Sequence, residues 1–175
     1  GFRGDADAGE HVKNGVDTKT GIPIISLYGD NKKPKPEQLK GIDIVLFDIQ
    51  DVGVRFYTYI STLTYVMEAG AENGVEVIVL DRPNPHDAYI DGPVLKDQWK
   101  SFVGMHNVPV VYGLTIGEYG NMVNGEKWLK NGVQAKYTLI PMLGYHKQKR
   151  YRDVDKPAPK LTHERSINVY TRFCR

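Results

Sequence analysis

The sequence predicts an α/β layered domain whose sheet is mostly parallel. Two apolar runs rich in β-branched residues, 42–49 (IDIVLFDI) and 75–80 (VEVIVL), have the nearly continuous hydrophobicity of strands that are covered on both faces. Between them, residues 59–72 place apolar side chains at the helical spacing i, i+3, i+4 and i+7. Predicted strands and helices therefore alternate along the chain, which favours a layered fold with parallel strands.

The length and composition of the chain narrow the class of protein. It has 175 residues, of which 41% are hydrophobic and 25% charged, which suits one domain with a buried core and excludes disordered, collagen-like and disulfide-rich classes. The 23 basic and 21 acidic residues leave a net charge of +2, which gives no reason to expect a nucleic-acid or membrane-surface partner. No apolar run approaches the roughly 20 residues that a membrane span needs. The single cysteine, Cys174, cannot form an internal disulfide.

The first half of the chain is predicted to hold a loop, a strand and two helices around the central strands. Residues 1–20 are rich in Gly, Asp and Lys and predict a loop. Residues 22–28 (IPIISLY) form a short apolar run that a glycine ends, which predicts a buried strand. Pro36 is placed to begin a short helix at its first turn. The longer helix over residues 59–72 is expected to stop at the Asn-Gly pair that follows it.

The second half is predicted to add a helix and one or two strands. Residues 108–112 are a candidate strand. Thr115 and Glu118 have the spacing of a capping box, and the helix that they open is expected to run to about Lys130, where another Asn-Gly pair stops it. Residues 134–141 alternate apolar and polar side chains and predict the last strand.

The composition changes near residue 145. Up to that point there is no internal repeat and no linker, so residues 1–145 are interpreted as one α/β domain. Residues 146–175 are dense in Lys, Arg, Asp and Pro, which predicts a weakly ordered or divergent tail.

Dense polar sequence follows two of the predicted strands. In open parallel sheets, ligands bind beyond the carboxyl ends of the strands, so these segments form the candidate site. Residues 48–59 (DIQDVGVRFYTY) offer two carboxylates, an amide, a guanidinium and tyrosines, and residues 81–85 read DRPNP. Carboxylates act as acids, bases or nucleophiles in glycosyl chemistry. Arginine binds a ligand carboxylate through two hydrogen bonds, and tyrosine offers a sugar ring an apolar face and a hydroxyl.

Each of these residues also has a purely structural interpretation. Asp48 or Asp51 could cap the helix that follows, and Arg55 could pair with one of them. Asp81 could organise a turn through its own backbone. Arg3, which lies between two glycines, is either a solvated loop residue or a cation held close to an anion.

Several familiar motifs are absent from the sequence. There is no G-x-G-x-x-G after a strand, no G-x-x-x-x-G-K-[ST] and no G-x-S-x-G, so the usual nucleotide cradle and serine nucleophile are missing. We therefore expect no cofactor. The histidines lack the spacing of metal ligands, so no metal is expected either, and each is predicted at the surface or in a turn: His11, His86, His106, His146 and His163.

The longest motifs of the chain resemble one family, the NamZ-type exo-β-N-acetylmuramidases, formerly a bacterial domain of unknown function. The resemblance covers roughly residues 1–145. The segments that carry it are GFRGDADAG (1–9), GVDTKTGIPIISLYG (15–29), DIQDVGVRFYTY (48–59), LDRPNP (80–85), YIDGP (89–93) and LTIGEYGNMVNGE (114–126).

The resemblance implies an architecture, an activity and a location. It implies an N-terminal Rossmann-like, three-layer domain with a mostly parallel sheet, followed by a smaller C-terminal domain, with the active site between them. Such enzymes remove N-acetylmuramic acid from the non-reducing end of peptidoglycan fragments, and the implied partners are muramic acid saccharides. Members are exported, so the intact protein is expected to be secreted, periplasmic or a cell-envelope lipoprotein.

The resemblance also implies roles for individual residues. In the family, Glu-His precedes Gly-Phe-Arg-Gly, and that glutamate is the candidate catalytic acid; this chain begins at Gly1, which suggests a truncated N-terminal portion without the C-terminal domain. Asp51, or alternatively Asp48, would be the second carboxylate. The lactyl carboxylate of the sugar would be bound by Arg3 or Arg55. The remaining substrate-binding candidates are Gln50, Tyr57, Tyr59, Asp81 and Asn84.

Two other classes of function stay open at this point. The same cleft without its acid would make a noncatalytic sugar-binding module. A Rossmann-like structural or nucleotide-binding module is the third possibility, and the missing phosphate loop counts against it.

Overall fold

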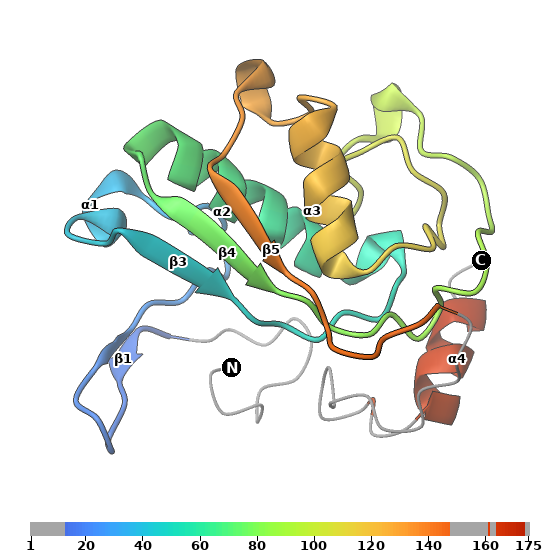
Figure 1. The fold of residues 1–175 in the computed structure, drawn as a ribbon, viewed down its shortest axis with the longest axis horizontal. Coiled ribbons are helices and arrows are strands. Elements are labelled where there is room, and N and C mark those ends of the chain that lie inside the picture. Colours follow the sequence, from blue (N-terminus) through green and yellow to red (C-terminus); the bar gives the residue numbers. More distant parts are fainter. Residues whose placement is uncertain (1–12, 148–160, 162–163, 174–175) are drawn as a thin grey trace.

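The fold is centred on a small parallel sheet. The computed structural model describes residues 13–147, 161 and 164–173. Strands β3 (Ile44–Phe47), β4 (Glu76–Leu80) and β5 (Tyr137–Ile140) lie in the order β3-β4-β5 and all run in the same direction (Figure 1). The predicted α/β class and parallel sheet are confirmed.

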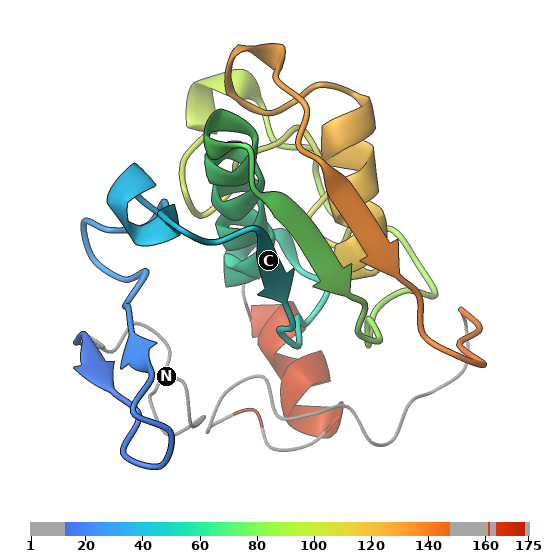
Figure 2. The same cartoon turned by 60° about the vertical axis from the view of Figure 1, so that its left-hand side comes forward.

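Two helices connect the strands and pack on the same face of the sheet. Helix α2 (Tyr59–Asn73) links β3 to β4, and α3 (Ile116–Gly125) lies between β4 and β5. Figures 1 and 2 show both helices on one side of the three strands. The register places matching rows of side chains toward these helices: Val45, Val77 and Tyr137 in one row, and Phe47, Val79 and Leu139 in the next.

The ends of these helices follow from local sequence signals. The α2 helix ends at Gly74, whose φ of 70° is left-handed and whose N–H donates to the Gly70 carbonyl. The α3 helix begins with the predicted capping box, in which Thr115 Oγ1 accepts from the Glu118 N–H at 3.2 Å and Glu118 Oε2 accepts from the Thr115 N–H at 3.0 Å. A four-residue helix, α1 (Pro36–Leu39), begins at the predicted proline and buries Leu39.

The opposite face of the sheet is open in the described part of the chain. Ile44, Leu46 and Ile140 point to this face and are 48%, 63% and 47% exposed. The continuous apolar runs predicted that other elements would cover the sheet on both faces. Among the described residues, however, no helix packs on this second face to form a third layer. The apolar side chains of these strands therefore form a surface against which another element could pack.

Residues 22–28 do not form a buried strand. Of this run, only Pro23–Ile24 forms a strand (β2), which pairs antiparallel with Gly15–Val16 (β1) in a hairpin apart from the main sheet (Figure 1). Ile22 and Ile25 are exposed. The apolar run was misleading because a short hydrophobic segment fits a hairpin as well as a central strand.

Two other elements differ from the sequence prediction. Residues 108–112 form no strand but only isolated bridges from Val111 to Val54 and Asp91. Helix α3 ends at Gly125, five residues early, because the chain turns at Lys127 with a φ of 56° before a short 3₁₀ helix at Lys130–Gly132.

Part of residues 146–175, which were predicted to form a weakly ordered or divergent tail, is helical. A ten-residue helix, α4 (Glu164–Phe173), lies near the carboxyl ends of the strands (Figure 2). Its Ile167 is buried against Val52, Val54 and Val111. The rest of the predicted tail lies mostly outside the described residues. No described helix is both long and apolar enough to cross a bilayer.

Candidate active site

The carboxyl ends of β3 and β4 lie side by side, as the sequence predicts. Asp48 follows β3 and accepts an ion pair from Arg82, with 2.6 Å between Arg82 Nε and Asp48 Oδ1. Gln50 is buried and donates through Nε2 to the Pro83 carbonyl at 2.8 Å. The two polar segments therefore form one edge, because parallel strands end on the same side of a sheet.

The two candidate carboxylates of this edge differ sharply in exposure. The Asp48 side chain is 41% exposed, so a ligand can reach it. Asp51 is only 5% exposed; its Oδ2 accepts from the Gly53 N–H at 2.8 Å and from the Tyr112 hydroxyl, while its Oδ1 is buried and has no hydrogen-bond partner among the described residues. Burial raises the pKa of the Asp51 carboxyl, and these hydrogen bonds only partly offset it.

Tyrosines surround the buried carboxyl. Tyr57 and Tyr59 meet edge to face, with 5.0 Å between ring centroids, and Tyr112 contacts Tyr119 at 5.1 Å. Burial raises the pKa of all four hydroxyls, and the Asp51 carboxylate raises it further. These tyrosines are therefore hydrogen-bonding and packing groups rather than bases at neutral pH.

The loop that carries these residues is held in a strained conformation. Thr58 lies between the two tyrosines with a φ of 69°, a left-handed value that a threonine rarely adopts. It immediately precedes α2 and makes no side-chain cap. Backbone strain of this kind persists only where the surroundings fix it, and it is frequent at functional sites.

The structure describes only one of the two candidate arginines, Arg55 and Arg3. The Arg55 guanidinium donates to the carbonyls of Val108 and Pro93, the latter at 3.0 Å, so it fixes a loop rather than an ion pair. Burial lowers the pKa of Arg55, although the group remains a cation. Arg3 lies outside the described residues, and its role stays a prediction.

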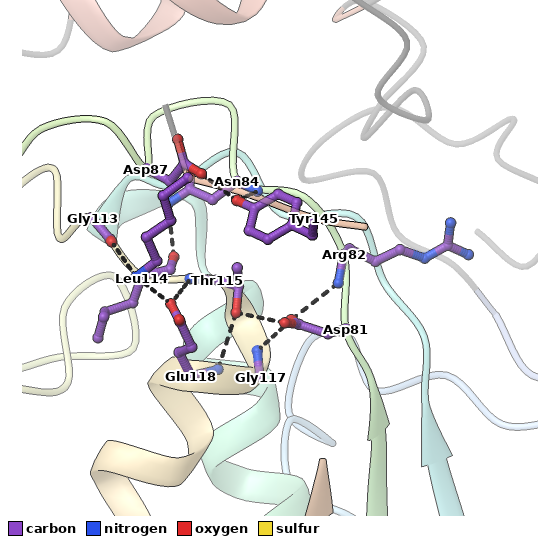
Figure 3. A network of polar contacts seen from close by, with 11 residues as sticks. Asp81, Arg82, Asn84, Asp87, Gly113, Leu114, Thr115, Gly117, Glu118 and Tyr145 are labelled. Atoms are coloured by element: carbon purple, nitrogen blue, oxygen red, sulfur yellow. Dashed lines mark hydrogen bonds and ion pairs between the residues drawn. The ribbon is translucent and has the colours of Figure 1, made fainter. Parts of the chain in front are cut away.

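Asp81 joins the end of β4 to the start of α3 (Figure 3). Its Oδ2 accepts from the Thr115 hydroxyl at 2.7 Å, and its Oδ1 accepts from the Gly117 N–H at 2.9 Å and the Arg82 N–H at 3.1 Å. The positive end of the helix and these donors suit a carboxylate. Asp81 therefore has a clear structural task at the edge.

Replacing Asp81 with alanine is expected to lower the free energy of unfolding by about 2 kcal/mol, because two donors at the start of α3 lose their acceptor. Urea denaturation of the purified chain measures this loss. Asp97→Ala is the matched control: Asp97 is exposed and, in the described part of the chain, its side chain pairs with Lys100 and Asn107, so its loss should be much smaller than that of Asp81→Ala. Equal losses in the two variants would contradict the role assigned to Asp81.

The Asn84 side chain also forms its hydrogen bonds within the protein. Its Nδ2 donates to the Leu114 carbonyl at 2.7 Å, and its Oδ1 accepts from the His86 N–H at 2.7 Å. Next to it, the Tyr145 hydroxyl contacts the Asn84 N–H at 3.3 Å and donates to Asp87 (Figure 3). Asn84 thus ties the loop after β4 to the neighbouring loops.

Sequence reasoning missed three residues of this edge: Tyr112, Tyr145 and His86. His86 was predicted at the surface or in a turn, but it is 1% exposed, and its Nδ1 lies 2.7 Å from the Val52 carbonyl. A local signal for His86 existed, because an asparagine side chain often accepts from the N–H two residues on. The partners of Tyr112 and Tyr145 are 61 and 58 residues away, and no local signal marks them.

No metal site is formed by the described residues. Within 13–147, 161 and 164–173, no three His, Cys, Asp or Glu side chains approach closely enough to hold an ion. The polar groups of the edge are oxygen-rich and hydrogen-bonding, which suits a hydroxylated ligand.

The fold and this edge define an α/β protein with a candidate ligand site beyond its parallel strands. A family model described as "Exo-beta-N-acetylmuramidase NamZ, N-terminal" matches residues 1–165, and the chain belongs to this family. The predicted resemblance is confirmed, and the match extends beyond the boundary predicted at residue 145.

Known proteins of this kind are longer than the chain. The Bacillus subtilis (strain 168) protein named peptidoglycan beta-N-acetylmuramidase NamZ is 45% identical over 175 aligned residues, which is 97% of this chain and 41% of the relative. Two crystal structures of DUF1343 family proteins from Bacteroides fragilis NCTC 9343 have TM-scores of 0.83 and 0.84, with 44% and 42% identity. They cover 89% of this chain, which spans 43% and 41% of theirs.

Proposed function

We propose that this chain is part of an exo-β-N-acetylmuramidase that releases N-acetylmuramic acid from the non-reducing end of peptidoglycan fragments, in the cell envelope or outside the cell. The family match supports the reaction class. The observation that carries the proposal at residue level is the exposed Asp48 carboxylate, which stands at the carboxyl end of β3. Peptidoglycan lies outside the cytoplasmic membrane, so the substrate requires an exported protein.

Asp48, rather than Asp51, is proposed as the carboxylate that faces the substrate. Cleavage of a β-glycoside develops positive charge at the anomeric carbon, which a carboxylate in contact with the sugar stabilises or traps. Asp48 is accessible for that contact, whereas both oxygens of Asp51 are covered. Asp51 is instead a positioning residue that holds the Gly53 N–H and the Tyr112 hydroxyl.

The leaving oxygen also needs a proton. The family resemblance assigns this proton to a glutamate that precedes the Gly-Phe-Arg-Gly motif, outside the sequence printed here. Recognition of the lactyl carboxylate is assigned to Arg3, because Arg55 is occupied by two backbone carbonyls. Tyr59, at the start of α2, would offer its ring to the sugar.

Release of nitrophenol from a chromogenic β-N-acetylmuraminide tests the proposed function. The gene product that contains residues 1–175 is expected to hydrolyse this compound and to leave the matching β-N-acetylglucosaminide largely intact, because only muramic acid carries the lactyl group. Absence of release would contradict the muramidase. Binding of N-acetylmuramic acid without release would support the noncatalytic sugar-binding alternative.

A pair of variants tests the role of Asp48. Asp48→Asn is expected to lower kcat by about 10²–10⁴-fold, the usual range for a carboxyl that acts on the reacting bond. Asp43→Asn is the matched control, because Asp43 is exposed at the opposite end of the same strand. If Asp48→Asn kept full activity while Asp51→Asn lost it, the two carboxyls would have to exchange roles.

A further inference from the structure

A second candidate site lies on the helix layer, away from the edge of the sheet. A cavity of about 480 Å³ opens between α2, the loop over residues 100–107 and the segment after α3. Glu68 on its wall follows Tyr59 by nine residues, so it stands about 13 Å along the α2 axis from the end at the candidate active site. The cavity therefore lies farther along α2 than the candidate active site.

Aromatic rings form two walls of this cavity. Tyr65 stacks on Phe102 with 5.7 Å between centroids and 17° between planes, and His106 lies against Trp128 at 5.5 Å. Trp128 is 38% exposed, so part of its ring is accessible to a ligand. Partly exposed aromatic rings that line a concave surface are typical of ligand sites.

Polar groups stand between the aromatic walls. The imidazole of His106 is fixed by the Tyr119 hydroxyl, which lies 2.9 Å from Nδ1, and Nε2 makes no hydrogen bond to a described residue. Burial and the nearby Lys100 lower the pKa of His106 to about 4, so the ring is neutral at physiological pH. Glu68 accepts from the Lys130 N–H at 2.9 Å at the floor of the cavity.

The charges around the cavity are balanced. Lys100 pairs with Asp97 at 2.8 Å, and Lys33 pairs with Glu68 and Glu72 at 3.2 and 2.7 Å. These acidic partners offset Lys100 and Lys33, while Lys130 and Lys32 also line the cavity and the hollow beside it, together with the carboxylate of Asp30. A ligand with apolar faces, hydroxyl groups and no net charge fits this lining best, and a pyranose ring has that chemistry.

The length of the site indicates that it can hold more than one sugar ring. A second hollow of about 520 Å³ shares Tyr65, Glu68 and Lys130 with the first and continues past Lys32 and Lys33. The two hollows adjoin along one side of α2. We propose that they form a second saccharide-binding site, which holds neutral N-acetylhexosamine units of a glycan against Tyr65, Phe102 and Trp128.

Two different lines of argument support the two parts of this proposal. A sugar site on the helix layer rests on the cavity, its rings and its balanced charge. The choice of N-acetylhexosamine as the sugar rests on the proposed function, because peptidoglycan glycan chains contain that unit. Such a site would hold the glycan on the protein surface while its end is cut at the edge of the sheet.

Tryptophan fluorescence tests the site directly, because the chain has only two tryptophans, Trp99 and Trp128. Trp99→Phe leaves Trp128 as the sole tryptophan. Titration of this variant with N,N′,N″-triacetylchitotriose is expected to shift or quench its emission in a saturable manner. Trp128→Phe is the matched optical control, in which the remaining Trp99 should report little change. A linear, unsaturable response of Trp128 would overturn the proposal.

Calorimetric titrations then assign the lining residues. Trp128→Ala and Phe102→Ala are each expected to weaken binding of the trimer at least about tenfold, since aromatic anchors supply much of the affinity of such sites. Circular dichroism checks that each variant is folded, and Phe102, on a loop, provides the test if Trp128→Ala unfolds. Unchanged affinity in both folded variants would overturn the proposal.

The outcome for this site is separable from the muramidase activity. Asp48→Asn should abolish hydrolysis and leave binding of the trimer unchanged, because Asp48 lies at the other site. Loss of trimer binding in Asp48→Asn would show that the trimer occupies the edge of the sheet and would overturn a second site. If the unaltered gene product hydrolysed no muraminide yet bound the trimer at Trp128, the proposed function would fail and the saccharide site would stand.

Discussion

Gly53→Ala is expected to lower the free energy of unfolding by at least about 3 kcal/mol. Gly53 has a φ of 74°, and a Cβ added there would lie 1.9 Å from Asn84 Oδ1. The Asn84 side chain cannot move aside, because it donates to the Leu114 carbonyl and accepts from the His86 N–H. The substitution would therefore push apart the two strand ends that form the candidate active site.

Gly74→Ala is the matched control for this prediction. Gly74 has a similar φ of 70°, but nothing lies within 4 Å of an added Cβ. Only backbone strain remains, which costs about 1 kcal/mol. Urea denaturation followed by circular dichroism compares the two variants. Equal losses would show that the contact between Gly53 and Asn84 is not tight in solution.

Asp51→Asn is expected to stabilise the protein at neutral pH, and the gain should depend on pH. Burial raises the pKa of Asp51 in the folded protein above its value in the unfolded chain. Stability is therefore full below the unfolded pKa and falls as the pH rises toward the folded pKa, because only the unfolded chain releases the proton easily. Each unit of difference costs about 1.4 kcal/mol at a pH above both values. The asparagine side chain does not ionise and removes this loss.

Unfolding free energies measured from pH 4 to pH 7 test the sign of the stability difference between Asp51→Asn and the wild type. The curves of the wild type and Asp51→Asn should lie close together near pH 4 and separate as the pH rises, with the variant the more stable. Asp48→Asn is the comparison on the same loop: it removes an ion pair that is partly exposed, and its effect at neutral pH should be a loss of at most about 1 kcal/mol. If the free energy of unfolding of the wild type instead rose relative to that of Asp51→Asn as the pH increased, the burial of Asp51 would be contradicted.

The sequence carried most of the central architecture because its signals are local. The strands over 42–49 and 75–80 are continuous apolar runs, the α2 helix has a regular apolar spacing, and Thr115 and Glu118 cap α3 as the motif requires. The position of the polar edge also followed from a general property of parallel sheets. The hairpin at β1 and β2 was missed because its strands are only two residues long and give little periodic signal. The α4 helix was missed although its sequence has a clear helical periodicity, because the charged and proline-rich composition before it outweighed that signal.

The assignment of roles within the edge was not available from sequence. Asp48 and Asp51 are three residues apart and chemically identical, and only the packing of Tyr112 and Gly53 decides which of them is covered. Similarly, Arg55 was expected to pair with a carboxylate, but its guanidinium donates hydrogen bonds to the carbonyls of the distant residues Pro93 and Val108. Such choices depend on contacts across the fold, which no local pattern encodes.

The open face of the sheet has a consequence for how this chain behaves in solution. In the part of the chain that the structure describes, Ile44, Leu46 and Ile140 leave an exposed apolar surface on this face of the sheet. Salts such as sulfate strengthen apolar association, so the colloidal stability of the chain should fall as they are added, while mild denaturant should disperse it. Concentration and salt type would therefore influence measurements on the 175-residue chain even where its fold is unchanged.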